Sequence, residues 1–557
     1  MKKVIFSFLF LILPGLTDSI AQGAVVQIDT ASTIADASLP PFDQVKPGDT
    51  LLLEPGRRSF LIIRNFLGAP GIPIIIINGN GAVLIETDHY FGISIRNCRY
   101  FRLTGSGDTS VFYGIAVQHI PGGSAIGIGE MSSDFEVDHI SIEHVSGGGI
   151  YAKTDPDCSF SSTREKFTQF NTIIHDNYIA DVGMEGLYIG STKYFGQTIN
   201  CNGFDTLLLP CLLIGVHVFN NIIKYTGWDG MQISSASSGC QIYHNTVMYD
   251  SQKEFYNQMS GILIGGGSKC DCFNNNISNG NGNGIESHGL GGYKIYNNLI
   301  VDAGRGFLPN DTTQMIHGIF LNDVTGQSDS SYNIMFNDII NPKSDGIRFA
   351  SLLSRNNLIA SNAIINPGNF NFYQNGHTSF KGVDSYIMFP EPGFDGLVKN
   401  NFFSRVAGEA KFEENGLSLR PDSPLINAGY PDTENIMFDF NNHPRVFGTY
   451  ADIGAYEYNP AYIGIPENQW PVKPDPGVFP DPVNQFLVIR FDAPVQSELV
   501  LDIIDFQGKI VLQKKYPEHP GGEMTCITDV GQMIPGIYFY SLHSDGKFST
   551  GRFIKSN

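Results

Sequence analysis

An acidic and a basic side chain lie two residues apart in the segment 284–288, which reads GIESH. Residues two apart in a β-strand point to the same face, so Glu286 and His288 are expected to lie side by side. A carboxylate beside an imidazole suits general acid/base catalysis. A histidine such as His288 is by itself more often incidental than catalytic. Whether the pair could be functional therefore depends on the element that carries it.

That element is one copy of a repeat. An Asn is followed nine residues later by a Gly that opens an apolar, alternating strand, as in Asn177/Gly186, Asn221/Gly230, Asn275/Gly284 and Asn337/Gly346. Two more copies, Asn245/Gly261 and Asn298/Gly318, keep both ends but lengthen the gap. The full unit is 23 residues long. A fixed period of this size with two-residue alternation predicts a solenoid of β-strands.

The strand after each Gly has two faces. Its first and third residues are apolar and are expected to face the core, so its second and fourth residues should face outward. Taken in coil order, the outward residues are Tyr151, Lys153, Tyr188, Gln232, Ser234, Leu263, Glu286, His288, Phe320, Asn322 and Arg348. We interpret this mixed strip as a surface for a linear polymer; an incidental surface is the alternative.

Each kind of residue in the strip has a possible role. Glu286, His288 and Lys153 are candidates for proton transfer. Arg348, two coils from Glu286 and so about 10 Å away, is a candidate for holding a carboxylate or sulfate. The candidate substrate-binding residues are Tyr151, Tyr188, Gln232 and Phe320.

Two carboxylates stand directly before the Gly on adjacent coils, at Glu185 and Asp229. Carboxylates this close repel, so either one pKa rises or a cation such as calcium binds between them. Turn chemistry alone also favours Asp before Gly, which is the structural alternative.

The Asn positions and the residues two before them are interpreted as structural. Stacked amides can hydrogen-bond along the axis and satisfy bent backbone. The column contains Asn177, Asn221, Asn245, Asn275, Asn298, Asn337 and Asn362. The column two residues earlier is mostly aromatic and suggests packing: His175, Phe219, Tyr243, Phe273 and Tyr296.

Insertions interrupt the repeat beside the strip. They fall at residues 249–258, 305–314 and 193–211, and another follows Tyr151. Loops that interrupt a regular scaffold at neighbouring coils often border a functional site. These insertions therefore support the interpretation of the strip as a ligand-binding surface.

Composition limits the class of partner. The formal charge of −20 disfavours nucleic acid and anionic lipid, and only 16% of the residues are charged. Residues 1–21 carry two lysines, an apolar run and small residues before Gln22, which predicts a signal peptide. No later segment is long and apolar enough to span a membrane, so the mature chain is expected to be exported and soluble.

The eight cysteines suit a compartment that permits disulfides. Cys240 and Cys270 share one position on successive coils, so they either form a disulfide or stack as free thiols. Cys201 and Cys211 lie within one insertion and could close a loop.

The composition changes after the repeat. Residues 464–476 form a proline-rich linker, and residues 477–557 carry short alternating strands separated by turns. These strands predict a small antiparallel, immunoglobulin-like β-sandwich. The fold class is therefore all-β: a parallel β-helix over residues 22–463, which the first resemblance given next implies to be right-handed, followed by this sandwich.

Two resemblances extend this interpretation. The segment PGDTLLLEPG, together with SLRPDSPLINAG, DFNNHPR and ADIGAYEY, resembles the ends of secreted right-handed β-helix proteins of the chondroitinase-B-like kind. The elements FPDPVNQFLVI, IIDFQGKIV and DVGQMIPGIYFYSL resemble the C-terminal sorting domain of type IX secretion cargo. The second resemblance implies handling by the type IX machinery, then release or attachment at the cell surface.

The known catalytic motifs of these β-helix enzymes are absent from the sequence, including the calcium and Lys/Arg motif of the lyases. The function therefore remains open between two classes: an enzyme acting on a polysaccharide as lyase, hydrolase or epimerase, and a non-catalytic glycan-binding adhesin or structural surface protein. If the protein is a lyase, Glu286/His288 or Lys153 would supply the base and Arg348 or a cation would neutralise a uronate. Calcium is the only cofactor that the sequence suggests.

Overall fold

The computed structural model describes residues 23–307, 314–368, 386–390, 392–413 and 418–459, and most of the strands between 478 and 555. The predicted signal peptide (1–21) and linker (464–476) lie outside these residues, as does the central part of the insertion at 305–314.

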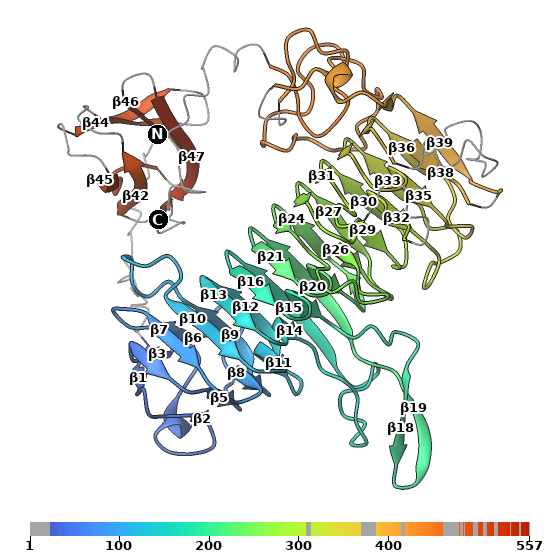
Figure 1. Ribbon diagram of the computed structural model, residues 1–557. Coiled ribbons are helices and arrows are strands. Elements are labelled where there is room, and N and C mark those ends of the chain that lie inside the picture. Colours follow the sequence, from blue (N-terminus) through green and yellow to red (C-terminus); the bar gives the residue numbers. More distant parts are fainter. Residues whose placement is uncertain are drawn as a thin grey trace, which may run out of the picture.

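Three long parallel sheets run the length of the solenoid, and the chain visits them in a fixed order, B then A then C, on every coil (Figure 1). Sheet B contains the strands that follow the repeat Gly: β2 (Ile34–Asp36), β5 (Leu61–Arg64), β8 (Phe91–Arg96), β11 (Ser124–Gly129), β14 (Gly148–Ala152), β17 (Leu187–Ile189), β22 (Met231–Ile233), β26 (Ser260–Ile264), β29 (Asn283–Ser287), β32 (Ile319–Leu321), β35 (Ile347–Phe349) and β38 (Ile387–Met388).

Sheet A follows sheet B on each coil. Its strands are β1 (Val25–Ile28), β3 (Thr50–Leu53), β6 (Ile74–Asn78), β9 (Arg99–Thr104), β12 (Ser133–Asp138), β15 (Thr168–His175), β20 (Leu212–Phe219), β24 (Cys240–Tyr243), β27 (Cys270–Phe273), β30 (Tyr293–Tyr296), β33 (Tyr332–Met335), β36 (Asn357–Ala360) and β39 (Gly396–Lys399), with β23 (Ala236–Ser238) beside β20.

Sheet C closes each coil. Its strands are β4 (Gly56–Arg58), β7 (Val83–Glu86), β10 (Ile115–Ile120), β13 (Ile140–Val145), β16 (Tyr178–Val182), β21 (Ile222–Thr226), β25 (Thr246–Met248), β28 (Asn276–Ser278), β31 (Leu299–Val301), β34 (Asp338–Ile340), β37 (Ala363–Ile365) and β40 (Phe402–Ser404). The three sheets enclose one continuous core, to which the sheet B strands that follow the repeat Gly contribute their first and third residues after it, as predicted.

Three smaller features lie outside the coils. The insertion before sheet A carries a hairpin of β18 (Gln197–Cys201) and β19 (Phe204–Leu208), which projects from the solenoid in Figure 1. Short 3-10 helices form at η1 (Phe42–Gln44) and η4 (Ala407–Ala410). Residues from 418 to 458 pack against the last coils, where the guanidinium of Arg445 is buried and donates to Asn297 Oδ1 and to the carbonyl of Gly454.

The C-terminal segment forms two antiparallel sheets, which confirms the predicted sandwich. One contains β41 (Val478–Phe479), β42 (Phe486–Ala493) and β45 (Gly522–Asp529); the other contains β44 (Ile510–Tyr516), β43 (Leu499–Ile504), β46 (Gly536–Ser544) and β47 (Lys547–Lys555).

The asparagine column is a continuous hydrogen-bonded ladder at the turn between sheets A and C. Asn275 Nδ2 donates to Asn298 Oδ1 at 3.0 Å and to the carbonyls of Ile242 and Phe273, while its own Oδ1 accepts from the backbone and side chain of Asn245. The same pattern runs from Asn177 to Asn401, which adds one rung to those predicted. The turn bends the backbone away from regular pairing, so these amides satisfy its carbonyls.

The aromatic column is also structural, as predicted. Phe219, Tyr243 and Phe273 stack with interplanar angles of 7° or less, and His175 caps the column at 4.5 Å from the Phe219 ring. Burial alone would lower the pKa of His175, but hydrogen bonds to Asp176 and Glu136 outweigh it and raise the pKa to about 9. His175 is therefore a cation above the stacked rings.

The disulfides agree with one prediction and correct the other. Cys240 and Cys270 are paired across neighbouring coils, as suspected. Cys201 pairs with Cys158 rather than with Cys211, which is a free, buried thiol. The prediction of a Cys201–Cys211 loop is wrong because Cys201 lies at the turn end of the hairpin β18–β19, opposite Phe204, whereas Cys211 follows the end of β19.

Replacing Asn275 by Ala should lower the free energy of unfolding by about 3 kcal/mol, because several buried donors and acceptors lose their partners. Denaturant unfolding of the full chain measures the change. Asn276→Ala, at the next, half-buried position, is the control and should cost less than about 0.5 kcal/mol. Equal costs for the two variants would contradict a stabilising role for the ladder.

Replacing His175 by Phe should change how stability depends on pH. The pKa of His175 is higher in the folded state than the ordinary value of 6.5, so its contribution is fully present below pH 6.5 and is lost as the pH rises through about 9. The free energy of unfolding of the wild type relative to His175→Phe should fall by about 3 kcal/mol between pH 6 and pH 10. A difference that stays constant over this range would show that the pKa of His175 is the same in the folded and unfolded states.

Candidate functional site

The strand register of sheet B confirms the geometry of the predicted strip. Each outward residue pairs with the next along the stack, so one straight column crosses seven strands from β14 to β35. The column contains Tyr151, Tyr188, Gln232, Leu263, Glu286, Phe320 and Arg348. The alternation that was inferred from the sequence therefore places these side chains on one face.

Glu286 is the most highly connected member of the column. Its Oε1 lies 2.7 Å from Nε2 of His288, and its Oε2 accepts hydrogen bonds of 2.8 Å from Ser260 and Asn283. Burial would raise the pKa of Glu286, but these hydrogen bonds, led by that from His288, lower it below its usual value. An ionised Glu286 accepts a hydrogen bond from Nε2–H of His288. In that tautomer of the imidazole, Nδ1 carries the lone pair that can accept a proton.

Phe320 and Arg348 continue the column on the next two strands, which brings both near Glu286. Arg348 Nη1 lies 3.6 Å from Asp345 Oδ2, and the same oxygen lies 3.0 Å from Nδ1 of the buried His317. His317 and Asp345 therefore support the arginine from behind the strip. Glu286, His288, Phe320 and Arg348 are called the C-terminal group below.

Tyr151, Tyr188 and Lys153 form a separate N-terminal group. The two tyrosine rings are 5.3 Å apart, and Nζ of Lys153 lies 4.4 Å from the Tyr188 ring and 2.9 Å from Asp155. Four strand spacings separate Tyr151 from Glu286, about 19 Å at the usual distance between strands. Lys153 is thus too far from Glu286 to act on the same bond.

The middle of the strip is covered, contrary to the expectation that Gln232 faces a ligand. Gln232 is fully buried and Leu263 is 6% exposed. The insertion at 249–258 folds over them and places Gln258 beside Gln232. The sequence predicted that this insertion borders the site. It did not predict the contact made by Gln258, because the insertion has no repeat from which the position of a side chain could be inferred.

Gln258 reaches the two predicted metal-binding carboxylates. With its amide nitrogen turned inward, that nitrogen lies 2.9 Å from Asp229 Oδ2, 3.1 Å from Glu185 Oε1 and 3.1 Å from Gln232 Oε1. An amide group has two hydrogens for these three acceptors. In addition, Glu185 Oε2 accepts a 2.6 Å hydrogen bond from Tyr151.

The electrostatics of this buried cluster are unusual. Burial, reinforced by the charges of Glu286, Glu185 and Asp250, raises the pKa of Asp229 well above its usual value. Burial also raises the pKa of Glu185, although the bond from Tyr151 opposes it. Asp229 Oδ1 is buried without a hydrogen-bond partner. The cluster therefore holds either protons or a cation, as the sequence suggested.

Another group on sheet A has metal-ligand residue types. Ligand atoms of Glu136, Asp138 and His175 lie within 4.8 Å of one another. Arg102 already binds both carboxylates, at 3.0 Å from Glu136 and 2.8 Å from Asp138, and the raised pKa of His175 keeps its nitrogens protonated. These contacts make the group an ion-pair network.

Comparison with known proteins identifies the C-terminal segment. A family model described as a secretion system C-terminal sorting domain matches residues 477–556. A search of curated proteins finds no match. Within the described residues, no helix is long and apolar enough to cross a membrane.

Solved structures with similar topology are distant. A XylC complex with xylose (11% identity, TM-score 0.38) and the pectate lyase Pel9A (11%, 0.34) each match over 78% of this chain and 98% of their own. The enzymatically active domain of bacteriophage CBA120 tailspike protein 2 matches at 10% identity and a TM-score of 0.29, over 92% of this chain and 72% of its own. These values carry no inference about activity.

The strand pairing shows a right-handed parallel β-helix, and the sorting domain shows that the chain is exported by type IX secretion and released or held at the cell surface.

Proposed function

We propose that this exported β-helix protein binds a uronate-containing polysaccharide along sheet B and cleaves it at the C-terminal group. The observation that carries the proposal is the Glu286–His288 contact of 2.7 Å, placed two strands from Arg348 in one register column. These residues are partly exposed, with side-chain exposures of 16% for Glu286, 27% for His288 and 24% for Arg348.

The arrangement suits β-elimination. Ionised Glu286 orients His288, whose Nδ1 takes the proton from the carbon next to the sugar carboxylate. The electron pair of that C–H bond forms a carbon–carbon double bond as the glycosidic C–O bond breaks, and the departing oxygen takes a proton from water. Arg348 neutralises the carboxylate and so stabilises the charge that develops on it.

The remaining strip residues have binding roles in this proposal. Phe320 lies between Glu286 and Arg348 and offers an apolar face to a sugar ring. Tyr151, Tyr188 and Lys153 form a distal subsite about 19 Å from Glu286, so they contact only a longer chain. Gln232 supports the covering insertion and does not contact the polymer.

A non-catalytic glycan-binding adhesin is the second candidate. It is favoured by the covering of the strip at Gln232, which leaves no continuous open groove, and by the three hydrogen bonds that already occupy Glu286. A structural surface protein that contacts other proteins through the same strip is a further outcome of the test below.

Glu286→Gln and His288→Ala should each lower kcat/KM for glycan cleavage by at least about 100-fold, because each removes one half of the proton-transfer pair. The full chain is incubated with a panel of uronate-containing and neutral glycans, and both the product size and the absorbance of the unsaturated uronate are followed. Glu54→Gln, a half-buried glutamate of the first coils, is the control and should be fully active.

Three other results would change the proposal. Chain shortening without unsaturated product would indicate hydrolysis. Retention of intact glycan by the wild type and both variants would favour the adhesin. The absence of any interaction with the panel would favour a protein-contacting surface component.

We also propose calcium as a ligand of the buried cluster, held by Glu185 and Asp229 with the amide oxygen of Gln232 and that of Gln258, whose amide group would turn over from the orientation described above so that its oxygen faces the ion. These four side chains supply the oxygen donors that calcium prefers, and Asp229 Oδ1 lacks another partner. A bound ion would fix the covering insertion over sheet B.

Millimolar calcium should raise the melting temperature of the wild type by several degrees and leave that of Asp229→Asn unchanged, because binding to the folded state alone is stabilising. Magnesium is the control cation and should have a smaller effect. Equal shifts in the wild type and in Asp229→Asn, or no shift in either, would remove Glu185 and Asp229 as calcium ligands.

A further inference from the structure

A second column of side chains lines the outer edge of sheet C and contains none of the residues assigned above. Strand pairing places one residue of each coil at this edge, directly before the last residue of the longer strands. These residues share left-handed backbone angles, with φ between 51° and 59°, which turns their side chains outward in parallel. The column contains His119, His144, Asp181, Tyr225, Tyr249, Asn279, Asp302, Asn341 and Asn366.

The first part of this column is a ladder of rings with one ring missing. His119 and His144 stack at 5.4 Å, and Tyr225 and Tyr249 stack at 4.7 Å with an angle of 4°. Between the two pairs stands Asp181, which carries no ring. His144 and Tyr225 are thus two coils apart, about 10 Å, which is the space of one additional ring.

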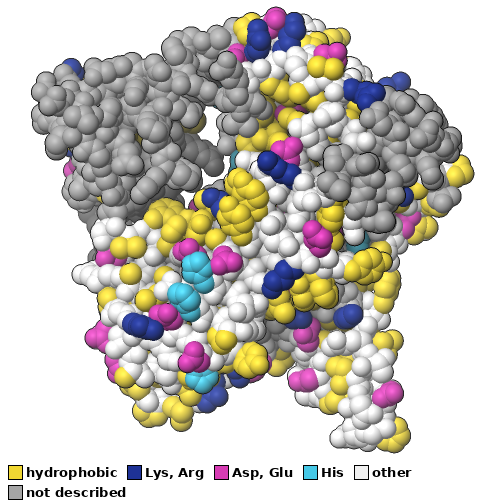
Figure 2. Space-filling model, in the orientation of Figure 1, with side chains coloured by type: hydrophobic (Ala, Val, Ile, Leu, Met, Phe, Trp, Pro, Cys, Tyr) yellow, Lys and Arg dark blue, Asp and Glu magenta, His cyan; other side chains and the backbone are white. Residues whose placement is uncertain are grey.

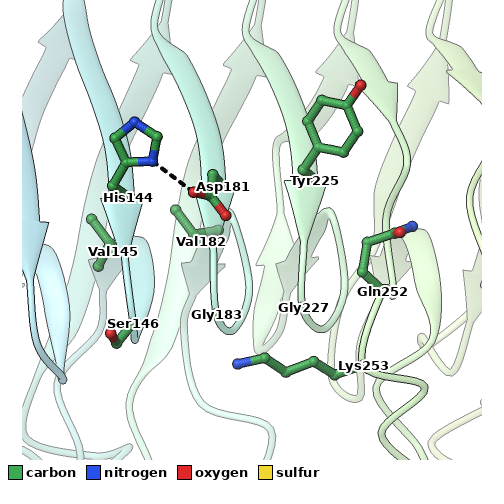
Figure 3. Close-up of a pocket in the computed structure, with 10 residues that line it drawn as sticks. All are labelled: His144, Val145, Ser146, Asp181, Val182, Gly183, Tyr225, Gly227, Gln252 and Lys253. Carbon is green, nitrogen blue, oxygen red and sulfur yellow. Dashed lines mark hydrogen bonds and ion pairs between the residues drawn. The ribbon is translucent and has the colours of Figure 1, made fainter.

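The carboxylate of Asp181 leaves that space open. It turns toward His144 and lies 2.6 Å from its Nδ1, as Figure 3 shows. Tyr225 is 50% exposed, and because Tyr249 covers one face of its ring, the other face looks toward the Asp181 coil. In the space-filling view, histidine and acidic side chains gather over this part of sheet C (Figure 2).

A depression of about 390 Å³ lies at this position and is bordered by His144, Asp181, Tyr225, Gln252 and Lys253. Its floor is shaped by glycines: a Cβ at Gly183 would lie 2.9 Å from Nζ of Lys253, and one at Gly227 would lie 3.0 Å from Cδ of Lys253. The lysine therefore runs beneath the two turns (Figure 3). The volume is within the range of small-ligand sites.

We propose that this depression is a second glycan-binding site, which takes a single pyranose ring at the Asp181 position of the ladder. A pyranose has an apolar face of C–H groups, which matches the free face of Tyr225. Its rim of hydroxyl groups matches the acceptor oxygens of Asp181 and the donor groups of Gln252 and Lys253. The site shares with the proposed function only the expectation that the exported chain meets a polysaccharide; it uses none of the residues on sheet B.

The position suggests how the site would work. The depression lies on the turns that lead from sheet C to sheet B, and residues 252–258 connect Lys253 at its edge to Gln258 over the strip. A polymer held here would be kept close to the exported protein while another part of the chain reaches sheet B, which raises its effective concentration there.

The ladder itself supplies the blocking variant. Asp181→Tyr inserts the missing ring, and because Tyr225 and Tyr249 adopt the same backbone angles, the variant should fold with an unchanged melting temperature. Asp302→Tyr makes the same substitution in the same column, outside the depression, and is the matched control. Tyr225→Ala removes the stacking face without filling the space.

Saturation-transfer NMR and calorimetry of the full chain with cellohexaose, xylohexaose and hexagalacturonate test the site. At least one hexasaccharide should bind to the wild type and to Asp302→Tyr, and its affinity should fall at least tenfold in Asp181→Tyr and in Tyr225→Ala. The Glu54→Gln variant, which lies outside both sites, should bind as the wild type does.

Two outcomes would overturn the proposal. One is the absence of binding by any of the three hexasaccharides. The other is binding that persists in both Asp181→Tyr and Tyr225→Ala; if Glu286→Gln or Phe320→Ala abolishes that binding, it belongs to sheet B. If Asp181→Tyr does not fold, Tyr225→Ala decides alone. If Asp181→Tyr and Tyr225→Ala still cleave polysaccharide, the proposed function stands whatever the outcome at the depression. Failure of this second site is therefore distinguishable from failure of the proposed function.

Discussion

The structure depends on keeping every coil in register with the next, and the asparagine ladder is the interaction that enforces this at the tightest turn. Each buried amide donates to the following coil and to carbonyls that the turn leaves unpaired. A coil shifted by one residue would lose these bonds and would also turn its apolar residues outward. The columns on the outer faces are straight because this inner column is straight.

The regular stack of coils tolerates irregular insertions on its surface. The insertions at 193–211 and 249–258, and the one that follows Tyr151, leave the coil without changing the strands before or after it, so they can carry residues that the repeat does not specify. Gln258 is such a residue: it belongs to no column, yet it contacts Glu185, Asp229 and Gln232 together. The burial of these groups, with its effect on the pKa of Asp229, results from the insertion rather than from sheet B.

The sequence predicted what is periodic. Alternation after each Gly was sufficient to place Glu286, Phe320 and Arg348 in one column. Equal spacing from the Asn placed Cys240 beside Cys270 but left open whether they form a disulfide, which the structure shows. It did not predict the burial of Gln232 or the pairing of Cys158 with Cys201, because both depend on how an aperiodic insertion folds back. The ring ladder at His144 and Tyr225 was missed for another reason: its positions share a backbone conformation but no residue type.

The spacing of this solenoid also limits how its surface can evolve. Neighbouring coils are separated by one strand spacing, so duplication or deletion of a coil moves everything beyond it by a whole step of about 4.8 Å. A site built from side chains on several coils, such as the one around Asp181, can therefore be lengthened, shortened or copied only in integral steps. New combinations of contacts on the outer faces therefore arise by adding or removing whole coils rather than by gradual displacement of side chains.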